Sequence, residues 1–362
     1  MQHWWLGTRS SRLHFNHFLL AYFPDPDYGG KRLFDDMLEQ ARTADRLGYR
    51  GVTIPEHHLI NILLTPAPLQ MAVRVAAEIK RLEIVTSVAV LPNHDMRSFA
   101  GEVAQADILC DGRLVLGVGR GAFPYEMERL GNSVSASRAK FEESLAVLVA
   151  LLSDEDVAWD GEFYRFEPLT IMPRPLTQPM PQLMIAVLVP EGIYACAKRG
   201  FHIQTTPLQG SLDKLLDQTR AFHRAKGELG AAGEHLRLSL SRVVYAARDD
   251  SDVKGKIALA HDYYSRFDDL FTRPGIVNRG RIAPLPRRQT VAELAENLLI
   301  CTPAEIVDRV NVYAESGIDD LILSANIGQT QAEQPEAMQR MAEEVTPYFV
   351  ERPVRAPVAV TA

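Results

Sequence analysis

Three neighbouring side chains with acid–base chemistry stand in the segment GVTIPEHHLINILLTP, residues 51–66. Glu56 precedes His57 and His58 in a stretch that is otherwise apolar. Histidine titrates near neutral pH and serves as a proton carrier or a metal ligand, and a nearby carboxylate orients it or raises its basicity. The triplet therefore fits a metal site, an acid–base site or ordinary local hydrogen bonding.

Spacing argues against a metal site at the two histidines. Adjacent side chains on an extended segment point to opposite sides, so one ion does not easily bind both. The chain also contains no HxH, HExxH or paired-cysteine motif of the kind that binds zinc. We therefore expect no metal here, which leaves acid–base chemistry and local hydrogen bonding as the alternatives.

The segment GVGRGA, residues 117–122, places one arginine between glycines. It matches the dinucleotide fingerprint G-x-G-x-x-A. However, no helix is expected to open at once, and no second strand with an acidic end follows about 20 residues later, so we do not expect a Rossmann phosphate loop. Gly119 and Gly121 allow close approach of the backbone to a ligand, and the planar guanidinium of Arg120 suits phosphate. We interpret the segment as a close-approach loop with one fixed cation.

A second arginine, Arg138, lies in the first turn of a helix expected over 137–152. A cation there opposes the helix dipole, whereas the helix N-terminus itself attracts anions. An anionic ligand shared with Arg120 explains this placement, and a solvated surface arginine is the alternative.

The elements that must position these residues alternate along the chain. Apolar runs predict eight strands, at 15–23, 51–54, 82–92, 113–119, 182–188, 201–207, 236–247 and 319–325. Helical periodicity fills most of the intervening segments, and Gly48 and Gly317 stand where two of the helices should end. Such alternation means a parallel sheet. Eight repeats predict an α/β fold of the (β/α)8 TIM-type barrel class with insertions, rather than a doubly wound sheet.

We expect residues 1–362 to form a single barrel domain. Residues 157–181 carry an Asp-Gly hairpin signal and five prolines, and we interpret them as an insertion. Residues 265–294 are rich in Pro, Gly and Arg and are long for a passive connection, so we expect a lid loop. Residues 351–362 are rich in Pro, Ala and Val and are expected to form a flexible tail.

Active sites of such barrels are built from the loops that follow the strands. The triplet Glu56–His58 follows the second expected strand, the segment 92–95 the third, the Arg120 loop the fourth, and the segment 189–192 the fifth. Polar groups therefore collect at one end of the expected barrel, where we place the site.

Composition excludes several other classes of function. Hydrophobic residues make up 46% and charged residues 23%, as in globular proteins, and the net charge of −7 gives no indication of a nucleic-acid partner. The N-terminus has no signal-peptide pattern, and no apolar run reaches the roughly 18 residues of a membrane span. The three cysteines are far apart, without a CxxC. We expect a reduced, cytoplasmic protein with no membrane segment.

Several of these segments together resemble the bacterial luciferase-like flavin-dependent monooxygenase family. They are EHH (56–58), SVAVLP (87–92), DGRLVLGVGRGAFPYEMERLG (111–131), SASRAKFEE (135–143) and TPAEIVDRVNVYAESGIDDLIL (302–323). The likeness extends over most of residues 15–350, and the EHH and GRLxLGxGRG blocks are its most specific parts.

This resemblance implies a two-component monooxygenase. The family uses reduced FMN (FMNH2) supplied by a separate NAD(P)H:flavin reductase, together with O2 as co-substrate. A flavin C4a-peroxide then oxidises a small organic substrate. The resemblance also implies a homodimer. It does not identify the substrate, nor does it decide between Baeyer–Villiger oxygenation, hydroxylation and another monooxygenation.

The resemblance also assigns roles to residues of this chain. His57 matches the catalytic base near the flavin, with Glu56 and His58 in orienting and packing roles. Arg120 and Arg138 match arginines that contact the flavin phosphate. Ser87–Val88 matches a non-proline cis peptide bond beneath the flavin ring, and the 265–294 loop matches a mobile lid.

The chain departs from the luciferase catalytic subunit at two places. That subunit has a Glu-Ser pair after the fifth strand, whereas this chain has Leu188-Val189. Phosphate contacts there must come from the backbone N–H groups of Val189, Glu191 or Gly192, or be lost. Gly119 replaces a reactive cysteine, so we do not expect light emission.

Three other functions are kept as alternatives. The first is an F420-dependent oxidoreductase of the same superfamily, which transfers hydride without O2. The second is a non-catalytic flavin-binding partner subunit, which tends to lose the histidine pair and the lid. The third is a metal-dependent barrel hydrolase.

Overall fold

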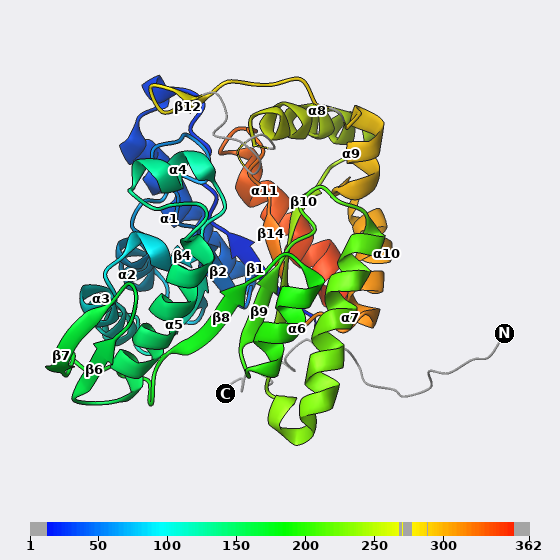
Figure 1. The fold of residues 1–362 in the computed structure, drawn as a ribbon. Coiled ribbons are helices and arrows are strands. Elements are labelled where there is room, and N and C mark those ends of the chain that lie inside the picture. The colour runs from blue at the N-terminus through cyan, green and yellow to red at the C-terminus, as the bar shows by residue number, and fades with distance from the viewer. Residues whose placement is uncertain (1–12, 268–269, 271–276, 288, 351–362) are drawn as a thin grey trace, which may run out of the picture.

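The computed structural model describes residues 13–267, 270, 277–287 and 289–350. At its centre, eight parallel strands form a closed barrel, and each strand pairs with the next one along the chain (Figure 1). They are β1 (His14–Phe18), β2 (Gly51–Ile54), β3 (Glu83–Thr86), β5 (Leu114–Gly119), β8 (Gln182–Ala186), β9 (His202–Thr205), β10 (Leu238–Ala246) and β14 (Asp320–Ser324). Parallel pairing of β14 with β1 closes the ring. The prediction of a TIM-type barrel is therefore confirmed.

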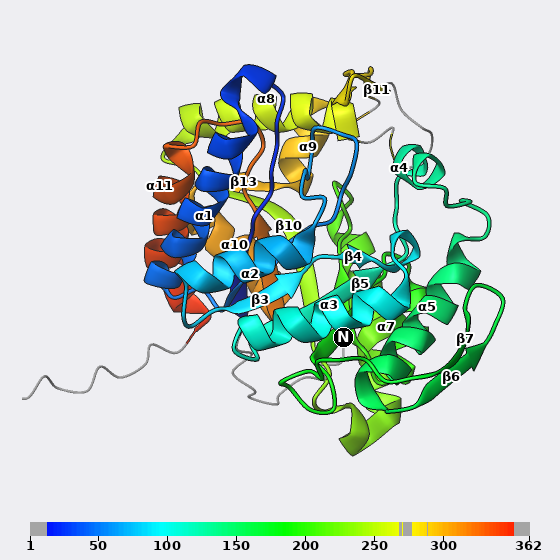
Figure 2. The ribbon, with the colours of Figure 1, turned by 90° about the vertical axis from the view of Figure 1, so that its left-hand side faces the viewer.

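Helices form the outer layer around the strands (Figure 2). They are α1 (Gly30–Leu47), α2 (Pro68–Glu78), α3 (Met96–Leu109), α4 (Pro124–Arg129), α5 (Ser137–Ser153), α6 (Pro190–Lys198), α7 (Leu212–Leu229), α8 (Asp250–Phe267), α9 (Val291–Asn297), α10 (Pro303–Glu315) and α11 (Glu333–Arg340). Short 3-10 or π turns occur at Pro26–Tyr28, Leu91–Asn93, Gly230–Gly233, Met341–Val345 and Thr346–Tyr348. Within the described ranges, no helix combines the length and apolarity that a bilayer crossing requires.

The predicted glycine stops are confirmed at both positions. Gly48 follows α1 with a φ of 78°, and its N–H bonds to the carbonyl groups at the end of that helix. Gly317 follows α10 with a φ of 81°. Glycine adopts this left-handed conformation without a steric penalty, so the chain turns back toward the barrel at these two residues.

Several shorter strands lie outside the ring of eight. β13 (Leu299–Cys301) pairs in parallel with the end of β10. β6 (Val157–Asp160) and β7 (Arg165–Leu169) form the hairpin expected in the segment 157–181, as a two-stranded sheet of their own. β11 (Val277–Asn278) and β12 (Arg281–Ile282) form a second hairpin within the expected lid segment.

Two strand predictions were too long. The run 82–92 is interrupted after Thr86, and pairing resumes only at β4 (Ala89–Val90), which pairs in parallel with β5. The expected strand 15–23 ends at Phe18, where the N–H of Leu20 bonds back to the Phe18 carbonyl and turns the chain out of the sheet.

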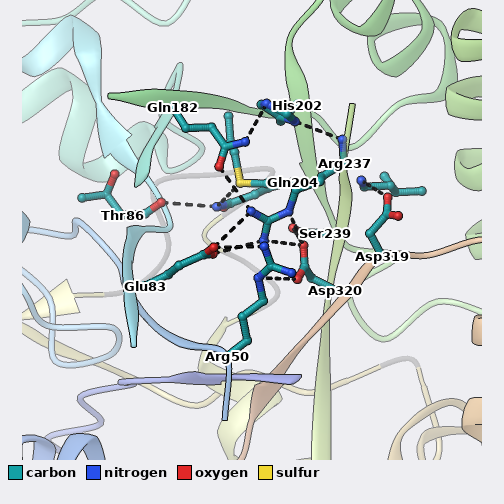
Figure 3. A network of polar contacts seen from close by, with 12 residues as sticks. Arg50, Glu83, Thr86, Gln182, His202, Gln204, Arg237, Ser239, Asp319 and Asp320 are labelled. Carbon is teal, nitrogen blue, oxygen red and sulfur yellow. Dashed lines mark hydrogen bonds and ion pairs between the residues drawn. The ribbon is translucent and has the colours of Figure 1, made fainter. Parts of the chain in front are cut away.

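A buried ionic network fills the barrel at the N-terminal ends of the strands. Arg237 donates to Asp320 at 2.9 Å and to Glu83 at 3.2 Å, and Arg50 donates to Glu83 at 3.0 Å (Figure 3). The Asp320 side chain is completely buried. Burial lowers the pKa of the adjacent His202 to about 4, so this ring is neutral at pH 7. Its Nδ1 accepts a hydrogen bond from the backbone N–H of Arg237. The network closes this end of the barrel.

We predict that Asp320→Asn strongly destabilises the protein. The change leaves the buried guanidinium of Arg237 with Glu83 as its only carboxylate partner in the described structure. Removal of one partner from a buried ion pair costs about 3–5 kcal/mol. Denaturant titration of both proteins should show a loss of unfolding free energy of this size.

The matched control is Asp35→Asn, which breaks the exposed ion pair with Lys31. Exposed pairs contribute less than about 1 kcal/mol, so this variant should unfold like the original protein. Equal effects of the two substitutions would contradict the structural role that we give the buried network.

Candidate active site

The carboxylate of Glu56 is the centre of a hydrogen-bond cluster in the loops after β2 and β3. Its side chain is fully buried. It accepts hydrogen bonds from the backbone N–H of Val90 at 2.8 Å, from His58 Nε2 at 2.9 Å and from His94 Nε2 at 3.0 Å. The Asn93 amide adds a longer contact of 3.3 Å. Glu56 thereby ties the two loops to each other.

These hydrogen bonds decide the charge of the cluster. Burial alone would raise the pKa of Glu56, but donation from His58 and His94 outweighs it and lowers the pKa to about 2. The same hydrogen bond raises the pKa of His58 above its ordinary value. Glu56 is therefore an ionised carboxylate at neutral pH.

His57 is held separately, by a different carboxylate. Its Nδ1 lies 2.8 Å from Glu126 Oε2, and its ring stacks on Phe123 with 4.5 Å between ring centroids. The His57 N–H bonds to the carbonyl of Thr65 at 3.3 Å. Its Nε2 forms no hydrogen bond within the described residues and is left available for proton transfer.

Sequence reasoning missed Glu126, which orients His57 and also accepts the backbone N–H of His58. Glu126 lies in α4, a helix of six residues that was not predicted. The signal for it was Pro124, because proline is favoured at the first position of a helix. Glu56, which precedes the histidine pair, orients His58 and His94 instead.

The two histidines therefore point to different carboxylates, as the argument from an extended segment predicts. His57 faces Glu126, whereas His58 faces Glu56. In the part of the chain that the structure describes, no group of three or more His, Cys, Asp or Glu side chains is arranged to hold a metal ion. The geometry favours acid–base chemistry at this position.

The glycines beside Arg120 are needed for close packing of the chain on itself. A Cβ atom at Gly119 would lie 2.6 Å from Val88 Cγ2, so β5 approaches the β3–β4 junction only because residue 119 is glycine. Gly121 has a φ of 88°, and a Cβ atom there would lie 3.0 Å from Val90 Cγ1. The close approach at Gly119 is thus to Val88, and its approach to a ligand stays a prediction.

Arg120 and Arg138 are both exposed, and neither forms an ion pair or hydrogen bond with the residues that the structure describes. Arg120 follows β5, and Arg138 lies in the first turn of α5, the helix between β5 and its neighbouring strand β8. Glu142 of α5 pairs at 2.8 Å with Arg199, the C-cap residue of α6, so α5 lies beside α6. The two cations belong to one sector of the barrel.

The segment after β8 completes this sector. Val189 is the N-cap of α6, and Glu191 and Gly192 lie in its first turn, where backbone N–H groups lack helical partners. A Cβ atom at Gly192 would lie 2.6 Å from Val187, so glycine allows this turn to pack closely. Two cations without a described carboxylate partner and a helix N-terminus are groups of the kinds that bind phosphate.

The Ser87–Val88 peptide bond is cis, as the family resemblance implies. The Ser87 hydroxyl donates to Gln204 Oε1 at 2.9 Å. The same segment touches Gly119 through Val88 and reaches Glu56 through the N–H of Val90. It therefore lies between the histidine cluster and the Arg120 loop.

The sequence model of a protein family described as luciferase-like monooxygenase matches residues 13–320. The chain belongs to this family. A relative from Acinetobacter baylyi, named flavin-dependent trigonelline monooxygenase, oxygenase component, is 28% identical over 333 residues, which cover 90% of this chain and 92% of the relative. The protein is thus an oxidoreductase whose named relatives are flavin-dependent monooxygenases.

Solved structures of the luciferase-like superfamily share the fold. The oxygenating constituent of 3,6-diketocamphane monooxygenase from Pseudomonas putida, in complex with FMN, has a TM-score of 0.74 and 17% identity, covering 94% of this chain and 99% of that one. An F420-dependent secondary alcohol dehydrogenase has a TM-score of 0.74 and 18% identity, covering 93% and 99%. The fold alone therefore fits either cofactor.

Segments outside the barrel brace the histidine loops of this luciferase-like chain. Lys140 of α5 donates to the carbonyl of Pro92 at 2.7 Å, and the hydroxyl of Tyr164 in the segment 157–181 donates to the carbonyl of His94 at 3.2 Å. Glu143 accepts the indole N–H of Trp159 and the backbone N–H groups of 162–164. The hairpin is therefore anchored to α5 and to the site.

The expected lid, 265–294, is only partly described, because residues 268–269, 271–276 and 288 lie outside the described residues. Within it, the N–H of Ile282 donates to the side chain of Asn61, which follows the EHH triplet, at 3.1 Å. The β11–β12 hairpin thus contacts the histidine loop. The expected tail, 351–362, lies outside the described residues.

We predict that Glu56→Gln alters the pH dependence of stability. A carboxylate with a pKa lowered from 4.5 to about 2 stabilises the fold above pH 4.5, and this contribution is lost as the pH falls toward 2. Its size is on the order of 3 kcal/mol. Denaturant titration across this pH range should show a steep loss for the original protein and a shallow one for the variant.

NMR titration of the histidine rings gives the control. In Glu56→Gln the pKa of His58 should fall, because the Glu56 hydrogen bond is the main cause of its rise. The pKa of His202, at the opposite end of the barrel, should stay at about 4. An unchanged His58 titration would show that Glu56 does not hold the cluster.

Proposed function

We propose that this chain is the oxygenase component of a two-component monooxygenase. It uses FMNH2 from a separate NAD(P)H:flavin reductase, together with O2, to oxygenate a small organic substrate. The observation that carries the proposal is His57, fixed through Nδ1 by Glu126 and through its face by Phe123, with Nε2 left available. The oxygenase-component relative supports the need for a reductase.

The residues present fit FMN. Arg120, Arg138 and the backbone N–H groups of Glu191 and Gly192 would hold the phosphate, and the Ser87–Val88 segment would lie beneath the ring. Bound FMNH2 supplies the electrons with which O2 is activated. This assignment rests on the two arginines, since cations without a described carboxylate partner beside a helix N-terminus suit a dianion.

The proposed role of His57 is to accept a proton at Nε2 and return it. A carboxylate at Nδ1 favours the tautomer that carries its proton on Nδ1, so Nε2 is the basic atom. Glu126 therefore sets the tautomer, while the Glu56 cluster fixes the loop that carries His57.

Buried aromatic side chains pack outward from His57. Phe123 meets Phe267 of α8 edge-to-face at 5.7 Å, and Phe267 stacks on Tyr263 at 5.7 Å. Such a cluster keeps water away from this side of His57, and an apolar or aromatic substrate suits these surroundings. We expect a homodimer, and the lid role of 265–294 stays part of the proposal.

An F420-dependent oxidoreductase is the second candidate, because a solved F420 enzyme is as similar in fold as the FMN enzyme. The phosphate cradle suits either cofactor, so only turnover separates them. A non-catalytic partner subunit fits less well, since such a chain has no need for an oriented histidine with an available nitrogen.

The decisive experiment measures turnover with each cofactor. The purified chain, a generic FMN reductase and NADH should consume O2 in a substrate-dependent manner across a panel of ketones, aldehydes and aromatic compounds that includes trigonelline. Anaerobic assay with reduced F420 should show no turnover. Hydride transfer from F420, with no substrate-dependent O2 use, would replace the proposal with the second candidate.

His57→Ala is the control for this experiment. The variant should bind FMN like the original chain but lose about 10²–10⁴-fold in turnover, the usual contribution of acid–base catalysis. Full turnover by a variant that binds FMN would remove His57 from the mechanism.

We predict that Arg138→Gln weakens FMN binding about 10- to 100-fold. A charge-assisted hydrogen bond contributes about 1.5–3 kcal/mol, and 1.4 kcal/mol corresponds to a tenfold change. Binding of riboflavin, which lacks the phosphate, should be unchanged. Fluorescence titration with both flavins gives the two dissociation constants.

Arg129→Gln is the matched control, because Arg129 is also exposed but rests on the Tyr125 ring and donates to its carbonyl group. It should alter neither flavin's affinity. If Arg138→Gln weakened riboflavin and FMN equally, Arg138 would have no phosphate role.

A further inference from the structure

A buried glutamine of β9, Gln204, reaches across the barrel to the Ser87–Val88 segment (Figure 3). Its Oε1 accepts the Ser87 hydroxyl at 2.9 Å, and its Nε2 donates to the carbonyl of Thr86 at 3.4 Å. The side chain is 4% exposed. Both ends of one amide therefore bond to two consecutive residues of the segment.

The neighbouring strands are shaped to admit this amide. A Cβ atom at Gly117 of β5 would lie 2.0 Å from the Thr86 carbonyl oxygen and 2.9 Å from Gln204 Nε2, so only glycine leaves the space. The hydroxyl of Thr86 donates to the carbonyl of Gly117 at 2.7 Å. Gln204 thus occupies a slot formed jointly by β3 and β5.

Part of the surroundings of Gln204 is apolar. Val85, Val115 and Met184 form a small apolar cluster in the same region of the barrel. A buried amide is unfavourable unless both its donor and its acceptor are hydrogen-bonded. Here the oxygen accepts from Ser87, and the nitrogen donates to the Thr86 carbonyl and to Met184 Sδ at 3.6 Å. Two of the three contacts are made to 86–87, which indicates that the amide serves this segment.

The segment is then fixed at two points. Gln204 holds residues 86–87, and the carboxylate of Glu56 holds the N–H of Val90. Val88, between these points, contacts the backbone at Gly119, next to Arg120. The position of Val88 in the site therefore depends on Gln204 from one side and Glu56 from the other.

We propose that Gln204 is a positioning residue, which holds the Ser87–Val88 segment at the height and tilt required by the flavin ring above it. This inference rests on the proposed function, because it assigns to the segment the role of a flavin bed. Gln204 does not touch the cofactor itself, and its effect passes through Ser87 and Thr86.

The test replaces Gln204 by methionine, which keeps length and volume but removes both hydrogen bonds. Because the phosphate cradle is intact, the dissociation constant of FMN should change less than tenfold. The visible circular dichroism of bound FMN should change, and kcat should fall about 10- to 100-fold, as expected for a misplaced reacting group. Gln204→Glu, which keeps the acceptor for Ser87, should restore part of the original spectrum.

The matched control is Gln40→Met. Gln40 is equally buried and makes two side-chain hydrogen bonds, to His17 at 2.9 Å and to Gln331 at 3.0 Å, but it lies in α1 outside the site. It should lower stability while leaving the flavin spectrum and kcat unchanged. Ser87→Ala removes only the hydrogen bond from Ser87 to Gln204 and changes the volume little, so it should give part of the Gln204→Met effect. This variant provides the test if Gln204→Met does not fold.

The outcomes separate this inference from the proposed function. If the unaltered chain binds FMN and turns over, but Gln204→Met and Ser87→Ala keep its spectrum and kcat, the positioning role of Gln204 is wrong and the function stands. If the unaltered chain neither binds FMN nor turns over with it, the proposed function fails, and the flavin role of Gln204 fails with it.

Discussion

The buried guanidinium of Arg237 is the constraint on which the direction of the barrel depends. A cation inside a closed sheet requires carboxylates around it, and Asp320 and Glu83 supply them from the first residues of β14 and β3. These ion pairs draw the N-terminal strand ends together, and side chains fill the barrel interior there. Only the opposite end can open toward a ligand, and the loops with acid–base side chains emerge there.

A second buried charge, that of Glu56, organises this open end. It is ionised because His58 and His94 donate to it, and it ties together the loops that follow the neighbouring strands β2 and β3. His57 does not take part in this cluster and bonds to a carboxylate of its own, Glu126, in the short helix α4 after β5. The arrangement separates a structural histidine cluster from one histidine with an available nitrogen, although the three residues at 56–58 are consecutive.

The sequence predicted the barrel because strands buried on both faces require nearly continuous apolar runs. The same rule failed at 82–92, because Ser87 and Val88 stand within a Val- and Ile-rich run of the sequence, whereas in the structure they are half-buried and lie outside the regular strand. His57 and Arg120 were accessible to prediction because each follows a strand. Glu126 was not, because its helix is too short for periodicity and its partner lies 69 residues away. Gln204 appeared only as part of a strand.

The β6–β7 hairpin is bound to the site by more than chain connectivity. Its turn is held by Glu143 of α5, and Tyr164 reaches the carbonyl of His94 while sharing a hydrogen bond with Ser144. Hydrogen bonds therefore join the hairpin, the central turns of α5 and the loop after β3 into one structural unit. A chimaera that takes this hairpin must therefore also take α5 and the loop after β3. Without Glu143 the turn of the hairpin would lose its hydrogen bonds, and Tyr164 would no longer be held against the carbonyl of His94.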